Sequence, residues 1–242
     1  MTEKLSSAKS ADFDERYARI KENIAAAMLA AGRSDEVLLL GATKTQSAEL
    51  INYAISRGLR AVGENRVQEY LSKYDALNLN GVARHFIGNL QTNKVKSILD
   101  KVDMIESVGS VHLAEVIGNL SEKAGKVTDI LLEVNIGSEL SKGGLLPEQV
   151  DETVEKCREI NGLRVMGLMT IPPICDNEIR QNVFFEKMQK LFVDICSKNR
   201  DNINITHLSM GMSDDYESAI RHGATIVRLG TALFGGRQSP LV

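Results

Sequence analysis

Short apolar runs rich in β-branched and aliphatic residues recur along this chain, and a segment with helical periodicity follows each of them. The runs lie at residues 37–41, 60–62, 85–87, 104–106, 129–134, 164–169, 205–208 and 225–229. Apolar residues three or four positions apart predict helices at 47–57, 66–77, 92–100, 111–123, 147–160, 178–198 and 214–221, and a further helix at 11–31 precedes the first run. Strands that alternate with helices pair in parallel through right-handed crossovers. The pattern therefore predicts an α/β protein.

Eight strand–helix units in 242 residues fit a closed (β/α)8 barrel, the TIM barrel. An open doubly wound sheet shares the same local pattern and is the main alternative. Dinucleotide-binding sheets of that kind carry a Gly-rich turn after the first strand, and Ala42-Thr43-Lys44-Thr45 follows the first strand here instead. We therefore predict a single-domain barrel over residues 1–242, with an extra N-terminal helix and about ten flexible residues before it.

The bulk composition argues against several classes of protein. The net charge is −3 and there is no long basic run, so nucleic-acid binding is not expected. No apolar stretch approaches the ~20 residues that span a bilayer, and the N-terminus lacks the apolar core of a signal peptide. The three cysteines form no CxxC pair, so neither a disulfide framework nor a metal site is expected. We predict a cytoplasmic protein. It is also predicted to be a monomer, because a closed barrel has no sheet edges.

Polar residues follow nearly every predicted strand, and Lys44 is the most informative of them. It comes just after the apolar run 37–41. In such a barrel the active site lies at the C-terminal ends of the strands. A lysine held there in a partly dry pocket reaches its neutral, nucleophilic form more easily than in water. The alternative is a solvated lysine after a strand.

The exits of the last two strands have the composition of an anion site. Ser209 offers a hydroxyl, and Gly230 lets a ligand approach the backbone closely. Gly230 and Thr231 offer N–H groups where a short helix would begin, and these barrels often hold a phosphate at this point. An ordinary strand-to-helix turn is the alternative. The spacing of Asp214 and Glu217 predicts a capping box for the helix at 214–221 rather than a ligand contact.

Arg228 interrupts the apolar strand Thr225-Ile226-Val227-Arg228-Leu229. A charged group in a buried strand needs a partner. A guanidinium can only donate hydrogen bonds, so it suits an aromatic ring nitrogen that accepts one. A structural ion pair is the alternative explanation.

Taken together, these positions resemble the pyridoxal phosphate homeostasis proteins, once called proline synthase co-transcribed proteins. The resemblance covers about residues 37–237 and implies a barrel similar to the N-terminal domain of bacterial alanine racemase, which holds pyridoxal 5′-phosphate (PLP) as a Schiff base. The motifs that carry it are Lys44-Thr45, Gly63-Glu64-Asn65, His85-Phe86-Ile87-Gly88-Asn89-Leu90-Gln91-Thr92-Asn93-Lys94, Ser209-Met210-Gly211-Met212-Ser213-Asp214-Asp215 and Val227-Arg228-Leu229-Gly230-Thr231-Ala232-Leu233-Phe234-Gly235.

The resemblance also implies roles for particular residues. Lys44 would form the Schiff base, and Arg228 would face the pyridine nitrogen. Ser209, Gly230 and Thr231 would hold the phosphate.

The family pattern further implies that Asn65, Met210 and His85 line the pocket. His85 has a second explanation, because a histidine at the start of a strand can instead orient a loop.

Two classes of function fit this cofactor. PLP catalysis uses the ring as an electron sink, and Arg228 would leave the ring nitrogen unprotonated and the sink weak. A racemase also needs a second acid/base. In alanine racemase a tyrosine from a separate domain supplies it, whereas Tyr216, the nearest tyrosine by sequence, falls on a predicted helix and the chain leaves no length for such a domain.

We therefore expect PLP binding with little or no turnover, and no catalytic residue. By resemblance, the role is in intracellular PLP homeostasis and in vitamin B6 and amino-acid balance, with PLP-dependent apo-enzymes as possible recipients. The alternative is a PLP-dependent enzyme with weak amino-acid racemase activity. A Schiff-base aldolase is more distant, because it would not explain Arg228.

Overall fold

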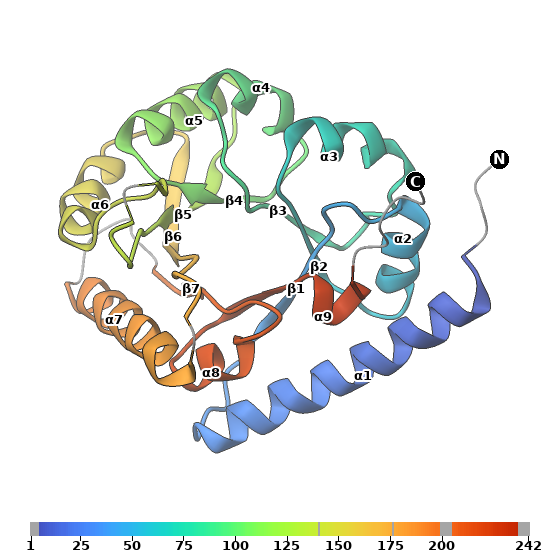
Figure 1. Cartoon of the computed structure of the whole chain (residues 1–242). Coiled ribbons are helices and arrows are strands. Elements are labelled where there is room, and N and C mark those ends of the chain that lie inside the picture. Colours follow the sequence, from blue (N-terminus) through green and yellow to red (C-terminus); the bar gives the residue numbers. More distant parts are fainter. Residues whose placement is uncertain (1–4, 140, 176, 199–204, 237–242) are drawn as a thin grey trace.

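Eight parallel strands close into a barrel in the computed structural model of the chain, which describes residues 5–139, 141–175, 177–198 and 205–236 (Figure 1). Each strand pairs with its neighbour in sequence, and β1 pairs with β8 to close the ring. The closed (β/α)8 barrel is therefore confirmed over the open sheet. The strands are β1 Leu38–Ala42, β2 Ala61–Glu64, β3 Ala83–Phe86, β4 Met104–Val108, β5 Thr128–Glu133, β6 Leu163–Met169, β7 His207–Ser209 and β8 Ile226–Leu229.

Helices surround the barrel, and α1 runs along the outside past α8 and α9 (Figure 1). They are α1 Ser7–Ala30, α2 Ala48–Ser56, α3 Val67–Lys73, α4 Val95–Ile98, α5 Val111–Lys123, α6 Val150–Arg158, α7 Glu178–Ser197, α8 Tyr216–Arg221 and α9 Thr231–Phe234. Short 3-10 turns extend α3, α4 and α6: η1 Tyr74–Ala76, η2 Thr92–Lys94 and η3 Pro147–Gln149. In the described part of the chain, no helix has both the length and the apolar character needed to cross a bilayer.

Side-chain caps explain where several helices begin. Ser6, Ser47, Ser110 and Asn177 each accept a hydrogen bond from the backbone N–H three residues later, which satisfies a donor that the first turn leaves free. Because Ser6 is such a cap, α1 begins at Ser7 and not at residue 11 as predicted. Residues 7–10, three of which are polar, hid this first turn from the apolar pattern. Of the predicted flexible N-terminus, residues 1–4 lie outside the described residues.

Two apolar layers hold the barrel together. One lies between the strands and the surrounding helices, where Val62, Phe86 and Phe185 are fully or almost fully buried. The other fills the barrel interior and includes Leu40 and Leu131. Alternate residues of a strand point to opposite faces, so most strands contribute to both layers. The interior layer forms the floor beneath the mouth of the barrel.

Candidate functional site

A cavity of about 270 Å³ opens at the C-terminal mouth of the barrel. Its walls come from the C-terminal parts of β1 and β8 and from residues that follow β1, β2, β3, β6, β7 and β8, and loops at this face carry the active site in barrels of this kind. Five of the eight predicted site residues line the cavity: Lys44, Asn65, Arg228, Gly230 and Thr231. The structure therefore brings together side chains that are up to 187 positions apart (231 − 44) in the sequence.

Lys44 lies in the turn between β1 and α2, two residues past the end of β1. It borders the cavity, yet the residue as a whole is exposed. This exposure favours the alternative of a solvated lysine over partly dry surroundings. The structure places Lys44 at the barrel mouth, as predicted.

Arg228 extends from β8 into the barrel interior and is 4% exposed. Its Nη1 donates to Ser209 Oγ over 2.6 Å, and its Nη2 donates to the Thr170 carbonyl over 2.7 Å. Burial lowers the pKa of Arg228, while nearby carboxylates, Glu106 first, oppose the shift. Glu106 Oε2 lies 4.0 Å from Nη1, so the buried guanidinium has a charged partner.

Glu106 is the centre of this buried polar network. His85 Nδ1 lies 2.6 Å from Glu106 Oε1, and Ser209 Oγ donates to Glu106 Oε2 over 2.6 Å. Burial acts to raise the pKa of the Glu106 carboxyl, but the contacts with His85, Arg228 and Ser209 outweigh it and lower the pKa. Arg228 therefore belongs to a structural ion pair and also lines the cavity, while its contact with a ring nitrogen stays a prediction.

Three predicted site residues lie outside the cavity wall. Ser209 and His85 are buried in the polar network around Glu106, and Met210 is buried in the layer between the strands and the helices. The structure thus places the Ser209 hydroxyl against Glu106 and Arg228 rather than at the rim. His85 likewise contacts Glu106, which lies in β4.

Ser213 lines the cavity instead, four residues beyond Ser209. Its hydroxyl accepts a hydrogen bond from the backbone N–H of Ala232 over 3.0 Å, which ties the loop after β7 to the first turn of α9. The predicted capping box is wrong, because α8 begins at Tyr216 with Asp215, not Asp214, at the N-cap and no side-chain cap bond. Asp215 Oδ1 instead accepts from the N–H of Met212 over 2.6 Å. Asp215 therefore holds the loop in the conformation that places Ser213 at the cavity.

Asn65 carries an unsatisfied polar atom at the cavity wall. Its Oδ1 is buried and has no hydrogen-bond partner within the described ranges. The backbone of Asn65 is packed tightly against Gly88, where a Cβ would lie 2.1 Å from the Asn65 carbonyl oxygen. Gly88 is therefore needed for the loop after β3 to support Asn65. A buried polar atom without a partner is uncommon in proteins, and a polar ligand would satisfy it.

Comparison with known proteins identifies the class of barrel as that of the alanine racemase N-terminal domain. The family model of the alanine racemase N-terminal domain matches residues 16–238. A pyridoxal phosphate homeostasis protein of Aquifex aeolicus is 45% identical over 225 residues, covering 93% of this chain and 98% of its own length. One of Escherichia coli is 35% identical over 231 residues, covering 94% and 97%. The chain belongs to the family of pyridoxal phosphate homeostasis proteins.

A solved structure extends this comparison. PipY of Synechococcus elongatus, determined with PLP bound, has a TM-score of 0.80 and 28% sequence identity to this chain. The match covers 92% of this chain and all of PipY. The same barrel therefore accommodates PLP in a protein of similar length.

Proposed function

We propose that this chain binds PLP as a Schiff base of Lys44 and takes part in PLP homeostasis, with little or no catalytic turnover. One observation carries the proposal: an amine, a donor-only guanidinium and a Gly-Thr turn border a single cavity at the barrel mouth. The relatives named pyridoxal phosphate homeostasis proteins support it, as does PipY with PLP bound.

The residues present fit PLP. When bound, PLP supplies an aldehyde that condenses with a primary amine with loss of one water, and a ring that withdraws electrons. Lys44 would provide the amine. Arg228 would donate to the ring nitrogen, and two of its N–H groups already donate to Ser209 and Thr170, so its orientation is fixed before a ligand arrives. The unsatisfied Asn65 Oδ1 would gain a partner on the ligand.

The phosphate would lie at the rim that the residues after β7 and β8 form. Gly230 supports this placement, because the nearest atoms to a Cβ built there belong to Ala42, at 3.7 Å and beyond, which leaves the backbone open to a ligand. Thr231 and Ser213 also line the cavity, and the hydrogen bond from the Ala232 N–H to the Ser213 hydroxyl holds the two segments together. We assign the hydroxyl contact to Ser213 rather than Ser209, because the Ser209 hydroxyl is already engaged inside the barrel.

Weak or absent turnover is proposed from two features. A guanidinium cannot protonate the ring nitrogen at neutral pH, so the ring would stabilise a carbanion poorly. The second feature is the position of the five tyrosines. All five lie within the described residues, and none of them lines the cavity. The Tyr216 hydroxyl, for example, accepts a hydrogen bond from Asn23 of α1 over 3.0 Å. A racemase with a second acid/base is therefore the less favoured alternative.

We further propose that the protein acts in the cytoplasm as a monomer and passes PLP to PLP-dependent apo-enzymes. The free thiols of Cys157, Cys175 and Cys196 favour a reducing compartment. The exposed position of Lys44 favours release, since the proposed covalent bond would be accessible to water and to competing amines.

The test is borohydride reduction of the protein with added PLP, followed by peptide mapping. We expect one PLP adduct, on Lys44, in the wild-type chain and in Lys96→Ala, a control at an exposed lysine of α4. Lys44→Ala should lose this adduct and the yellow colour. Neither protein should exchange the α-proton of an added L-amino acid. Wild-type protein with neither colour nor adduct would refute PLP binding, and α-proton exchange that Lys44→Ala abolishes would establish the racemase alternative.

A further inference from the structure

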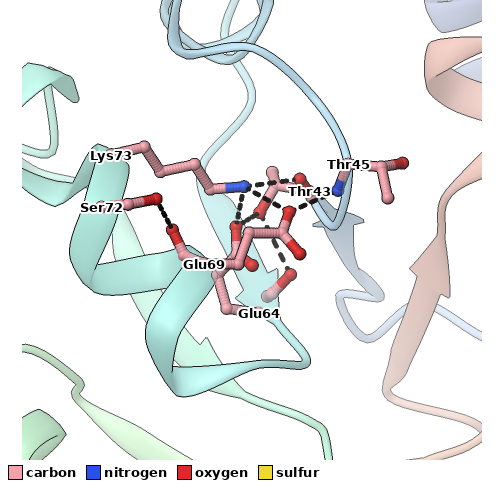
Figure 2. Close-up of polar contacts among 7 residues, drawn as sticks. Thr43, Thr45, Glu64, Glu69, Ser72 and Lys73 are labelled. Carbon is pink, nitrogen blue, oxygen red and sulfur yellow. Dashed lines mark hydrogen bonds and ion pairs between the residues drawn. The ribbon is translucent and has the colours of Figure 1, made fainter. Parts of the chain in front are cut away.

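Two side chains of α3 hold the backbone on either side of Lys44 (Figure 2). Lys73 Nζ donates to the carbonyl of Thr43 over 2.8 Å, immediately before Lys44. Glu69 Oε1 accepts from the backbone N–H of Thr45 over 2.5 Å, immediately after it. The turn that carries the exposed amine is thus fixed at both peptide units that flank it.

The conformation that these contacts hold is a strained one. Thr45 has a φ of 63°, in the left-handed region that β-branched residues rarely adopt. Strain of this kind persists only where the surrounding structure enforces it, and it gathers at functional sites. Within the described residues, the only other non-glycine residue with positive φ is Ser138. Thr45 is the one that borders the cavity.

Lys73, one of these two side chains, also contacts a buried carboxyl group. Lys73 Nζ lies 2.6 Å from Glu64 Oε1 and 3.2 Å from Glu69 Oε1, and the Glu64 side chain is 2% exposed. Thr43 Oγ1 also donates to Glu64 (Figure 2). Burial raises the pKa of Glu64, and the charge of Lys73 opposes that shift. Apolar residues of similar volume often stabilise a fold as well as a buried ion pair does, so global stability alone gives no reason for this cluster.

We propose that Glu64, Glu69 and Lys73 form a positioning clamp that holds the Lys44 turn in its left-handed conformation and aims the amine at the cavity. The part of this proposal that concerns the chemistry at Lys44 rests on the proposed function. The effect of the clamp on the turn does not depend on that function, because the turn can be observed without PLP. All three are positioning residues, since their contacts are with Thr43, with the backbone of Thr45 and with one another.

The first test uses the protein without PLP and measures amide hydrogen exchange at Thr45 by NMR. Glu69→Ala removes the acceptor of that N–H, and we expect faster exchange at Thr45 with unchanged exchange in the barrel strands. Glu152→Ala on α6 is the matched control, because Glu152 and Lys156 form an exposed ion pair at the same i,i+4 spacing. Equal exchange at Thr45 in all three proteins would overturn the clamp.

The second test separates positioning from binding. We expect Glu69→Ala and Lys73→Met to slow the appearance of visible imine absorbance with PLP by roughly 10- to 100-fold, in line with the cost of misplacing a reacting group by about 1 Å. Affinity for pyridoxine 5′-phosphate, which lacks the aldehyde, should not change. Lys156→Met is the control for Lys73→Met. An equal loss of affinity for both compounds, or an unchanged rate of imine formation, would overturn the proposal.

A glycine at position 45 provides the decisive comparison. Glycine adopts positive φ without steric cost, so in a Thr45→Gly background the further change Glu69→Ala should slow imine formation much less than it does with Thr45 present. If Glu69→Ala does not fold, Glu69→Gln replaces it, because the amide oxygen can still accept from Thr45 and should preserve the rate. Equal slowing in both backgrounds would contradict the clamp. If wild-type protein forms no adduct at Lys44, the proposed function fails, and the amide exchange at Thr45 still tests the clamp.

Discussion

Arg228 and Glu106 depend on each other inside the barrel. Their side chains are 3% and 0% exposed and lie 4.0 Å apart at the nearest charged atoms. Arg228→Met would leave the Glu106 carboxylate buried without its cation, which typically costs about 3–5 kcal/mol. We expect that loss in the free energy of unfolding by urea at neutral pH.

Arg164 offers a matched control for this change. It forms an ion pair with Asp129 over 2.7 Å, but its side chain is 52% exposed. Exposed pairs contribute about 0–1 kcal/mol, so Arg164→Met should cost far less than Arg228→Met. Similar losses in the two variants would show that the interior network is not a mutually dependent unit.

The pKa shift of Glu133 predicts that the stability of the fold depends on pH. It follows Leu131 by two positions on β5, and Leu131 faces the barrel interior. Burial raises the pKa of Glu133, and the charge of Arg228 offsets only part of the shift. The folded chain therefore holds this proton more tightly than the unfolded chain, and stability falls as pH rises from the unfolded to the folded pKa.

Glu133→Gln should remove that loss. We expect the variant to gain stability relative to wild type as pH rises from about 4 to about 7, measured as the difference in the free energy of unfolding at each pH. Glu148→Gln, at an exposed position of η3, should show no such trend. A gain that shrinks with rising pH would contradict the direction of the Glu133 pKa shift.

At the scale of elements, the loops after β2 and β3 support each other through Gly88. A Cβ at this position would lie 2.1 Å from the backbone oxygen of Asn65, and Ser107 Oγ donates to the Gly88 carbonyl over 2.5 Å. Gly88→Ala must therefore shift one loop, and overpacking of this kind typically costs about 1–3 kcal/mol. Because Asn65 lines the cavity, the change should also weaken binding of pyridoxine 5′-phosphate.

Gly143→Ala is the control for this substitution. A Cβ at Gly143 would meet nothing within 4 Å, so the free energy of unfolding should change by less than about 0.5 kcal/mol. Calorimetric binding and urea unfolding on the two variants complete the comparison. If Gly88→Ala keeps both its stability and its affinity, the loops are not coupled at this contact.

The elements were predictable from sequence because their signals are local. The period of apolar residues located all eight strands, and α5 was predicted with the bounds it has, Val111–Lys123. Errors arose where polar residues join an element, as at the start of α1. The bounds of β7 also differ from the predicted 205–208, because the pattern does not show which residues pair with β6.

The site was predictable only in part, for a different reason. Family motifs and strand exits pointed to Lys44 and Arg228, and both line the cavity. Whether Ser209 or Ser213 faces a ligand depends on the direction of each side chain at the end of β7, which spacing alone did not settle. The contact of Lys73 with Glu64 requires α3 to lie beneath the Lys44 turn, and no local pattern encodes that.

For the whole molecule, the first and last units must be joined to complete the ring. The pairing of β1 with β8 joins them in the sheet, and α1 joins them outside it, where it contacts α2, α8 and α9. Phe13 of α1 is fully buried, and its ring packs against Tyr17, Tyr53 and Phe234 at centroid distances of 5.5, 5.8 and 5.9 Å. This aromatic cluster links α1, α2 and α9, so α1 is an integral part of the barrel.

Phe13→Ala should therefore destabilise the whole molecule. Removing a buried phenylalanine side chain costs about 3–5 kcal/mol, and we expect this loss in a single cooperative urea transition, because the cluster holds both ends of the ring. Leu29→Ala is the control, since Leu29 lies on the same helix and is 81% exposed, and it should change stability by less than about 0.5 kcal/mol. If Phe13→Ala instead unfolds α1 in a separate early transition and leaves the barrel as stable as before, then α1 is an appendage and the pairing of β1 with β8 suffices to close the ring.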